Sequence, residues 1–209
     1  MMRVKEIYGT LNGEGANSGR AVVICRFSGC NLWDGSEKGR HQSRCGLCDE
    51  SIEGTDGPLG GEYPPQKLAE QVEACWKSCF GDWDTGRHVL FTGGEPALQL
   101  TGELIDLCKK KGFFTAIESN GTLALPPGLD WICISPKSGT ELSVCRGDEL
   151  KLVYPQKGLD PESLRGLDFG HFFLQPRFHP QEPENIKLSV DYCLAHPQWR
   201  LSLQIHKIV

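Results

Sequence analysis

The sequence has no run of about 18 consecutive apolar residues, the length that a membrane-spanning helix needs. Its first ten residues, M-M-R-V-K-E-I-Y-G-T, also lack the apolar stretch of a signal peptide. We therefore expect a soluble, cytoplasmic protein without a membrane partner. The sequence shows no internal repeat, second domain or low-complexity tail, and 209 residues suffice to bury a core, so we expect a single domain over 1–209.

An excess of positive charge is missing as well. The chain has 22 Lys and Arg against 27 Asp and Glu, a net charge of −5, which gives no electrostatic reason to expect nucleic-acid binding. The glycine-rich stretch 9–20 lacks the Lys-Ser/Thr pair of a phosphate-binding loop, so it is expected to be a flexible turn. Alternatively, Asn12 and Glu14 point from this tight backbone into a site.

Cysteine, by contrast, is abundant, with ten residues. The chain is long for a disulfide-stabilised secreted domain and has no export signal, so disulfides are not expected. Six of the cysteines lie in apolar or helical patterns and are expected to be buried as small hydrophobic residues. These six are Cys25, Cys75, Cys79, Cys108, Cys133 and Cys193.

The stretch from Cys30 to Cys48 contains three cysteines in a polar loop, with fourteen residues between the first two and two between the last two. Three soft thiolates brought together in this way are typical of a metal site. Structural zinc and complete iron–sulfur clusters usually take four protein ligands. The site therefore either lacks one ligand or keeps one coordination position open for chemistry. A structural zinc site would be complete with Cys30, His41, Cys45 and Cys48.

Apolar patterns predict an α/β fold of about six to seven strands and three main helices. The helices are expected at 64–80, 100–111 and 183–196, and the strands at 21–29, 87–92, 113–118, 131–135, 149–155, 171–176 and 199–206. Alternation of strands and helices indicates a mainly parallel sheet. Connections 138–148 and 155–170 look too rich in glycine and proline for full helices. We therefore expect an abbreviated, partly open (β/α) barrel with the cysteine loop after its first strand.

Polar, chemistry-capable residues follow nearly every expected strand. In a parallel barrel the carboxyl ends of the strands share one rim, so these residues should line a single mouth. The set comprises the cysteines, Glu95, Glu118, Ser135, Lys137, Gln175 and His206. Arg26 lies in the apolar run just before the loop, and a buried arginine needs an anionic partner, either a protein carboxylate or that of a ligand.

The segment T-G-G-E-P at 92–96, together with the three-cysteine loop, resembles the radical S-adenosylmethionine superfamily. In that superfamily three cysteines bind three irons of a four-iron four-sulfur (4Fe-4S) cluster, and S-adenosylmethionine chelates the fourth. The fourteen-residue gap is similar to that of the 7-carboxy-7-deazaguanine synthases. So are L-N-G-E-G, C-R-F-S-G-C-N-L-W, C-x-x-C-D, E-S-N-G, S-P-K and H-P-Q-W-R-L-S-L-Q-I-H-K, and the resemblance covers about residues 4 to 207.

The resemblance implies a carbon–nitrogen lyase of queuosine and 7-deazapurine biosynthesis. The reduced cluster would cleave S-adenosylmethionine to a 5′-deoxyadenosyl radical, which would abstract hydrogen from C6 of 6-carboxy-5,6,7,8-tetrahydropterin. Ring contraction and loss of ammonia would then give 7-carboxy-7-deazaguanine. The family also implies an external electron donor, flavodoxin- or ferredoxin-like, and a homodimer. The alternative within the superfamily is a radical activase that acts on a partner protein.

The resemblance also implies roles for individual residues. The cluster would be held by Cys30, Cys45 and Cys48. S-adenosylmethionine would be held by Gly93, Gly94, Glu95, Ser135, Lys137 and Gln175. The pterin would be held by Asn12, Glu14, Arg26, Glu118 and His206. Magnesium would be held by Asp49, with Glu50 or Ser51 as a further ligand, because the family usually has threonine where this chain has Glu50.

Overall fold

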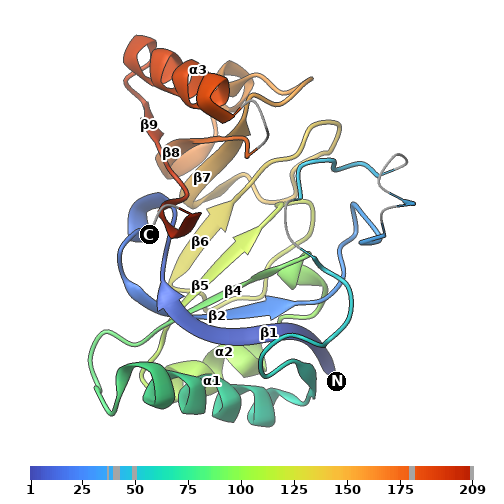
Figure 1. Cartoon of the computed structure of the whole chain (residues 1–209), viewed down its shortest axis with the longest axis vertical. Helices are drawn as coiled ribbons and strands as arrows, with labels where there is room; N and C mark the ends of the chain where they lie inside the picture. Colours follow the sequence, from blue (N-terminus) through green and yellow to red (C-terminus); the bar gives the residue numbers. More distant parts are fainter. Residues whose placement is uncertain (37, 40–42, 49–50, 179–181, 208–209) are drawn as a thin grey trace.

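A computed structural model of the chain describes residues 1–36, 38–39, 43–48, 51–178 and 182–207. Within these residues nine strands form one sheet in the order β3-β1-β2-β4-β5-β6-β7-β8-β9 (Figure 1). The strands are β1 (Met2–Leu11), β2 (Ala21–Phe27), β3 (Gly61–Tyr63), β4 (His88–Gly93), β5 (Phe114–Ser119), β6 (Trp131–Ile134), β7 (Arg146–Tyr154), β8 (Asp168–Pro176) and β9 (Trp199–Leu201).

Seven of these strands, β2 and β4 to β9, pair in parallel, which confirms the mainly parallel sheet. The expected count of six to seven is too low because β1 and β3 add an antiparallel edge. The cysteine loop therefore follows the second strand of the chain, not the first. A register shift between Val4 and Glu6 interrupts the alternation of buried and exposed residues in β1, so the sequence pattern of this strand is weak.

Two further expectations at the ends of strands are wrong. Residues 9–11 belong to β1, so the turn between β1 and β2 is shorter than predicted. The last strand ends at Leu201, and Ile205–Lys207 form a 3-10 turn. The chain leaves the sheet there because Ile205 donates its backbone N–H to the carbonyl of Gly13 at 3.0 Å, which draws the segment toward the β1–β2 turn.

The three helices lie close to their predicted positions, as α1 (Pro65–Phe80), α2 (Gly102–Lys110) and α3 (Glu182–Ala195). Helix α1 begins with a proline at its first position and ends before Gly81, whose φ of 82° favours glycine. The connections 138–148 and 155–170 contain no α-helix, as expected. The first runs into β7, and the second holds the 3-10 turn Pro161–Leu164 and the start of β8.

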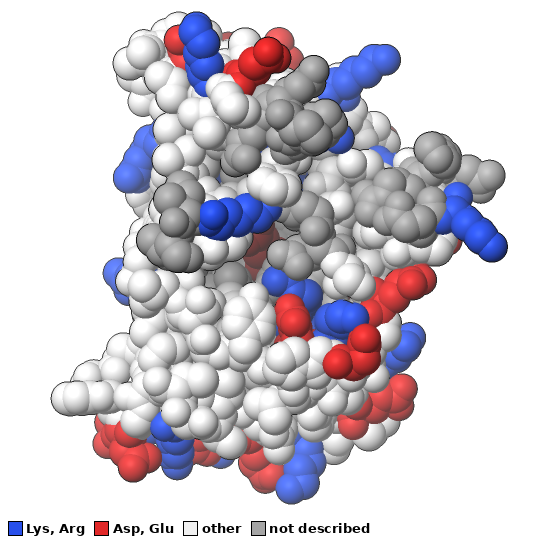
Figure 2. All heavy atoms as spheres, in the orientation of Figure 1, with Lys and Arg blue, Asp and Glu red and all other residues white. Residues whose placement is uncertain are grey.

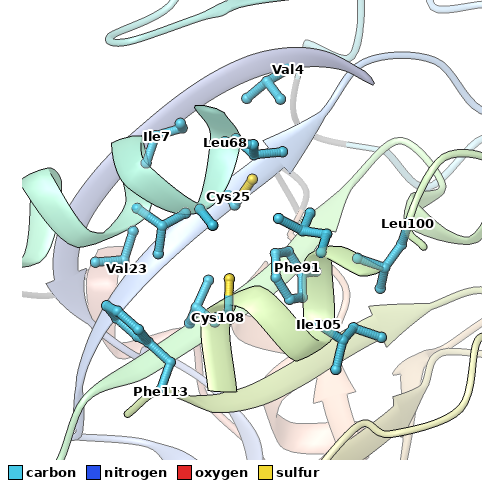
Figure 3. Packing of buried hydrophobic residues seen from close by; sticks show 14 of the residues in the cluster. Val4, Ile7, Val23, Cys25, Leu68, Phe91, Leu100, Ile105, Cys108 and Phe113 are labelled. Carbon is cyan, nitrogen blue, oxygen red and sulfur yellow. The ribbon is translucent and has the colours of Figure 1, made fainter. Parts of the chain in front are cut away.

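The hydrophobic core has two parts. The larger lies between α1, α2 and strands β1, β2, β4 and β5, and Figure 3 shows Leu68 and Ile105 of the helices with Phe91 of the sheet. The smaller is built from β6 to β9 and is covered by α3 (Figure 1). Both leave the carboxyl ends of the parallel strands free to carry polar residues.

Four of the six cysteines expected in the interior are buried there: Cys25, Cys75, Cys108 and Cys133. Burial raises the pKa of Cys75 and Cys108 to about 12, so both thiols are neutral at ordinary pH. Cys79 is exposed and Cys193 is half-buried, which corrects the prediction for these two. In the described part of the chain no helix is long and apolar enough to cross a membrane.

Candidate functional site

A cavity of about 450 Å³ opens at the carboxyl ends of the parallel strands. Figure 2 shows this face of the molecule hollowed near its middle, with acidic side chains in the depth. The volume suits a small-molecule ligand. The predicted site residues that line it are Asn12, Glu14, Arg26, Cys30, Cys45, Cys48, Gly93, Gly94, Glu118, Ser135, Lys137, Gln175 and His206. Three further residues named in the predictions, His41, Asp49 and Glu50, lie outside the described residues.

The three predicted cluster cysteines, Cys30, Cys45 and Cys48, are partly buried and line the cavity. Burial raises the pKa of the Cys30 thiol, and hydrogen bonds from the backbone N–H groups of Leu32 and Trp33 oppose this rise. The Leu32 amide donates to Cys30 Sγ at 3.4 Å. Amide donors of this kind stabilise negative charge on sulfur, as a metal-bound thiolate requires.

The three thiols offer soft donors to a metal. The described residues, which leave out His41, Asp49 and Glu50, contain no group of three or more His, Cys, Asp or Glu that could hold one metal ion. Zinc needs all its sulfur ligands about 2.3 Å from one centre, whereas an iron–sulfur cluster takes one thiolate per iron and so accepts ligands that stand farther apart. The donor set, three soft thiols facing one cavity, is therefore compatible with the cluster that the sequence suggests.

The segment after Cys30 is tied to the turn after β5. Asn31 Nδ2 donates to the hydroxyl of Thr122 at 2.8 Å, and its Oδ1 accepts from Asn120 Nδ2 at 3.0 Å. Asn120 Oδ1 in turn accepts from the backbone N–H and the hydroxyl of Thr122. This network joins the start of the cysteine loop to the E-S-N-G segment, so the two predicted motifs are parts of one wall.

The two glycines of the G-G-E-P segment are needed for close backbone approach. Gly93 has φ of 131°, a conformation that favours glycine, and a Cβ on Gly94 would lie 1.9 Å from the carbonyl oxygen of Gly29. The backbone N–H of Gly94 donates to the Phe27 carbonyl at 3.1 Å, and that of Glu95 to the Gly29 carbonyl at 2.8 Å. The segment therefore lies directly against the residues that lead to Cys30.

Glu95 is wholly buried, with no exposed side-chain surface, instead of lining the cavity. Its Oε1 accepts from the Ala97 amide at 2.9 Å and the Ser119 hydroxyl at 2.7 Å, and its Oε2 accepts from the Asn120 amide at 2.8 Å. Burial raises the pKa of Glu95, and these three hydrogen bonds oppose the rise. In this structure Glu95 fixes the turn after β4 to the end of β5.

The partner of Arg26 is a protein carboxylate. Its Nε donates to Glu6 Oε1 at 2.8 Å, and its guanidinium also reaches the hydroxyl of Tyr8 at 3.4 Å. Glu6 and Tyr8 come from the edge strand β1, which the sequence pattern did not reveal. Arg26 nevertheless lines the cavity, while its contacts with Glu6 and Tyr8 hold its side chain against β1.

The floor of the cavity is a buried charged cluster around Lys151 of β7, which the sequence patterns did not indicate. The side chain of Lys151 is 3% exposed, and its Nζ pairs with Glu14 and, at 2.8 Å, with Glu118. Burial alone would lower the pKa of Lys151, but the charges of Glu118 and Glu14 hold it well above its usual range. The available signal was a lysine within an apolar strand, L-K-L-V.

Glu14 is the most heavily bonded group of the floor. Its carboxylate pairs with Lys151 and accepts from Gln204 Nε2 at 2.8 Å and Gln175 Nε2 at 3.2 Å. Burial would raise the pKa of Glu14, but the charge of Lys151 and the hydrogen bonds from Lys151 and Gln204 lower it to about 2. The carboxylate is therefore ionised at neutral pH.

Two residues predicted to contact S-adenosylmethionine lie together at the end of β6. Lys137 Nζ donates to the Ser135 hydroxyl at 2.6 Å, and both side chains line the cavity. Gln175, at the end of β8, is 7% exposed, and its Oε1 is a buried acceptor with no hydrogen-bond partner among the described residues. Because buried acceptors are normally satisfied, a ligand that supplies an N–H or O–H donor fits this place.

Asn12 and His206 line the cavity from the β1–β2 turn and from the segment after β9. Asn12 Oδ1 accepts from the Glu14 amide at 3.1 Å, which shapes the turn that carries Glu14. The ring of His206 lies against Gly13, where an added Cβ would be 1.9 Å from His206 Nδ1. His206 is exposed and lines the cavity. The structure thus brings together the predicted residues that it describes, except the side chain of Glu95 and Ser51, which is exposed and does not line the cavity.

The fold and the cavity define an α/β protein with a small-molecule site at the carboxyl edge of a parallel sheet, the arrangement of many enzymes. No family model matches the chain. A 7-carboxy-7-deazaguanine synthase from Bradyrhizobium diazoefficiens is 53% identical over 205 residues, which cover 98% of this chain and 96% of that protein. The enzyme of the same name from Bordetella pertussis is 51% identical over 207 residues, 99% and 97% of the two chains.

A solved structure is similar to this chain over nearly its whole length as well. A crystal structure of QueE from Escherichia coli superposes with a TM-score of 0.70 at 25% identity, covering 97% of this chain and 93% of the other. Identity near one half over almost the whole of both proteins is far above the level at which a family is shared. The chain belongs to the 7-carboxy-7-deazaguanine synthase family, and it is therefore an enzyme.

Proposed function

We propose that this enzyme converts 6-carboxy-5,6,7,8-tetrahydropterin to 7-carboxy-7-deazaguanine and ammonia in queuosine and 7-deazapurine biosynthesis. The observation that carries the proposal is the meeting of three thiols, a G-G-E-P turn and a cationic–anionic floor in one cavity, in a chain 53% identical to a protein of that name. When bound, a 4Fe-4S cluster with S-adenosylmethionine supplies the hydrogen abstraction that the ring contraction requires.

The cluster would be held by Cys30, Cys45 and Cys48. The amide of Leu32 supports the charge of Cys30, and the Asn31–Thr122 contact sets the position of the loop against the turn after β5. In this proposal three protein thiols bind the cluster, so one coordination position of the cluster stays available to S-adenosylmethionine. The structural zinc alternative needs His41 as a fourth ligand and gives no role to the other residues that line the cavity.

S-adenosylmethionine would lie along the ends of β4, β6 and β8. Gly93 and Gly94 line the cavity and would hold it with backbone groups, and the buried Oε1 of Gln175 offers an acceptor for a donor group of the ligand. Ser135 and Lys137 add a hydroxyl and a cation. In this proposal Glu95 acts by fixing the backbone of the G-G-E-P turn, because its carboxylate is already occupied by three protein donors.

The pterin would lie over the floor. Arg26 presents a planar cation that matches the substrate carboxylate, while Glu14 and Glu118 accept from ring and amino N–H groups. Asn12 and His206 would close the site from the turn and the C-terminal segment. Magnesium stays a prediction, with Asp49 and Glu50 outside the described residues and Ser51 as the alternative to Glu50.

The remaining expectations concern the whole molecule. We propose one domain over 1–209 with a partly open barrel, supported by the hydrogen bonds from Ile205 N to Gly13 O and from Gly15 N to Ser202 Oγ, which bring the region after β9 toward the β1–β2 turn. An external one-electron donor, flavodoxin- or ferredoxin-like, would reduce the cluster, and the enzyme would work as a homodimer.

The test is anaerobic reconstitution followed by turnover. Iron, sulfide and zinc are measured, and the enzyme is then incubated with reductant, S-adenosylmethionine, magnesium and the carboxytetrahydropterin. We expect iron and labile sulfide, and formation of the deazaguanine product. Stoichiometric zinc without sulfide would overturn the radical chemistry, whereas cofactor cleavage without product would point to another substrate, such as the partner protein of an activase.

A further inference from the structure

Lys151 is a buried cation that faces the ligand space only through its partners. It lies in β7 between Leu150 and Leu152, both fully buried, and its side chain is 3% exposed. It does not belong to the cavity lining, whereas Glu14 and Glu118, the two carboxylates that it contacts, do. The contacts of Lys151 therefore link it to a ligand in the cavity through these two carboxylates.

The two carboxylates differ in what they have left to offer. Glu14 accepts from Lys151 at one oxygen and from Gln204 and Gln175 at the other, so protein donors use most of its capacity. For Glu118 the described contact is the ion pair of Oε1 with Lys151, at 2.8 Å. Glu118 lines the cavity, and its Oε2 retains acceptor capacity beside this ion pair.

Among the described residues, Lys151 is the cation paired with the carboxylates of the floor. Besides Glu14 and Glu118, the side chain of Glu149 is buried nearby and accepts from the Ala16 amide at 3.1 Å. Burial raises the pKa of Glu149, and the charge of Lys151 opposes this rise. Like charges held close together repel strongly away from water, so without Lys151 the carboxylates would separate or take up a proton.

We propose that Lys151 is a positioning residue for the substrate site: by pairing with both Glu14 and Glu118 it offsets their repulsion and fixes Glu118 with one oxygen turned to the cavity as acceptor for an N–H of the bound pterin. This inference rests on the proposed function. A purely structural ion pair predicts a different outcome, because a buried pair replaced by an apolar side chain changes folding stability and not the affinity for a ligand.

The first test is Lys151→Met in the reconstituted holoenzyme. We expect the KM for the carboxytetrahydropterin to rise at least about tenfold with a much smaller change in kcat, the pattern of lost uniform binding. Iron content should stay at the wild-type level, because none of the described contacts of Lys151 is with the three cluster cysteines. The matched control is Lys111→Met, which removes a cation paired with Glu73 at 2.6 Å outside the cavity and should leave KM unchanged.

Two further variants cover a failure of Lys151→Met to fold. Lys151→Arg keeps the charge and should hold KM within about threefold of wild type. In a cycle with Glu118→Gln, adding Lys151→Met to Glu118→Gln should raise KM by a smaller factor than Lys151→Met does alone, because the two changes share the Glu118 acceptor. An additive effect, or an unchanged KM in Lys151→Met, would overturn the positioning role while leaving the proposed function intact. Absence of product with the wild-type enzyme would instead overturn both.

Discussion

The two parts of the cavity, the wall that carries the three cysteines and the floor around Lys151, differ in how their side chains are stabilised. The floor is a set of complementary groups, in which Lys151 pairs with Glu14 and Glu118 and the protein satisfies its own charges. The wall carries three thiols, at Cys30, Cys45 and Cys48. Because these groups are alike, they do not form ion pairs with one another. The floor is therefore organised before any ligand arrives, whereas the wall needs an inorganic partner that binds all three sulfurs.

The sharpest way to separate wall from floor is Cys30→Ala. We expect loss of iron and sulfide and a fall in product formation of at least about a thousandfold, since the cofactor carries the chemistry. The melting temperature of the sheet should change little, because Cys30 lies outside the core clusters. The control is Cys145→Ala, an exposed thiol outside the cavity lining, which should behave like wild type. Full iron content in Cys30→Ala would contradict the assignment of the wall.

Arg26→Ala tests the ligand side of the floor. We expect the KM for the pterin to rise about a hundredfold, because a charge-assisted bidentate contact is lost, with iron content unchanged. Arg3→Ala, an exposed arginine near Glu62 on the same sheet, serves as the control and should not alter KM. Loss of iron in Arg26→Ala would show that the Arg26–Glu6 pair supports the fold of the wall instead.

Gly94→Ala tests the close backbone contact between the G-G-E-P turn and the residues that lead to Cys30. The new Cβ would meet the carbonyl oxygen of Gly29 at 1.9 Å, so the backbone leading to Cys30 must move. We expect the free energy of unfolding to fall by about 2–3 kcal/mol and iron incorporation to fall with it. In Gly102→Ala the added Cβ has nothing within 4 Å, so this control should keep both values. Equal free energies of unfolding and equal iron incorporation in the two variants would contradict the importance of this backbone contact.

The smallest expected effect is the pH dependence of Glu14→Gln. The pKa of Glu14 falls from 4.5 to about 2 on folding, so its ionised form stabilises the protein above about pH 4.5, and this contribution is lost as the pH falls to about 2. Urea unfolding should show Glu14→Gln about 2 kcal/mol less stable than wild type at pH 6, with the difference shrinking toward pH 3. A constant difference across this range would contradict the ion pair. Glu62→Gln, at an exposed carboxylate, is the control.

The sequence predicted the parts of this molecule whose signals are local. Apolar runs located the seven parallel strands, and the residues after those runs located the cavity, because parallel strands end at one edge. The antiparallel strand β1 escaped because its bulge breaks the alternation. Cys79 was expected inside from its helical spacing, but it lies in the last turn of α1, at the edge of the apolar face.

Pairings between distant residues were beyond the sequence pattern. Arg26 was known to need an anion, but only the fold shows that Glu6 supplies it. Lys151 is a lysine in an apolar strand, and nothing local connects it with Glu14, 137 positions earlier. Glu95 was expected at the ligand, and its burial under donors from Ser119 and Asn120 depends on how β4 and β5 end side by side.

The contact of Gln204 with Glu14, 190 positions apart, has a consequence for how the molecule folds. The larger core needs only β1, β2, β4 and β5 with α1 and α2, so it is able to collapse early, from contacts that are close in sequence. The floor closes only when the segment after β9 reaches back to the β1–β2 turn, and closing so long a loop is slow. During refolding, ligand binding should therefore recover later than the circular-dichroism signal of the helices. Recovery of binding then reports when the final folding step is complete.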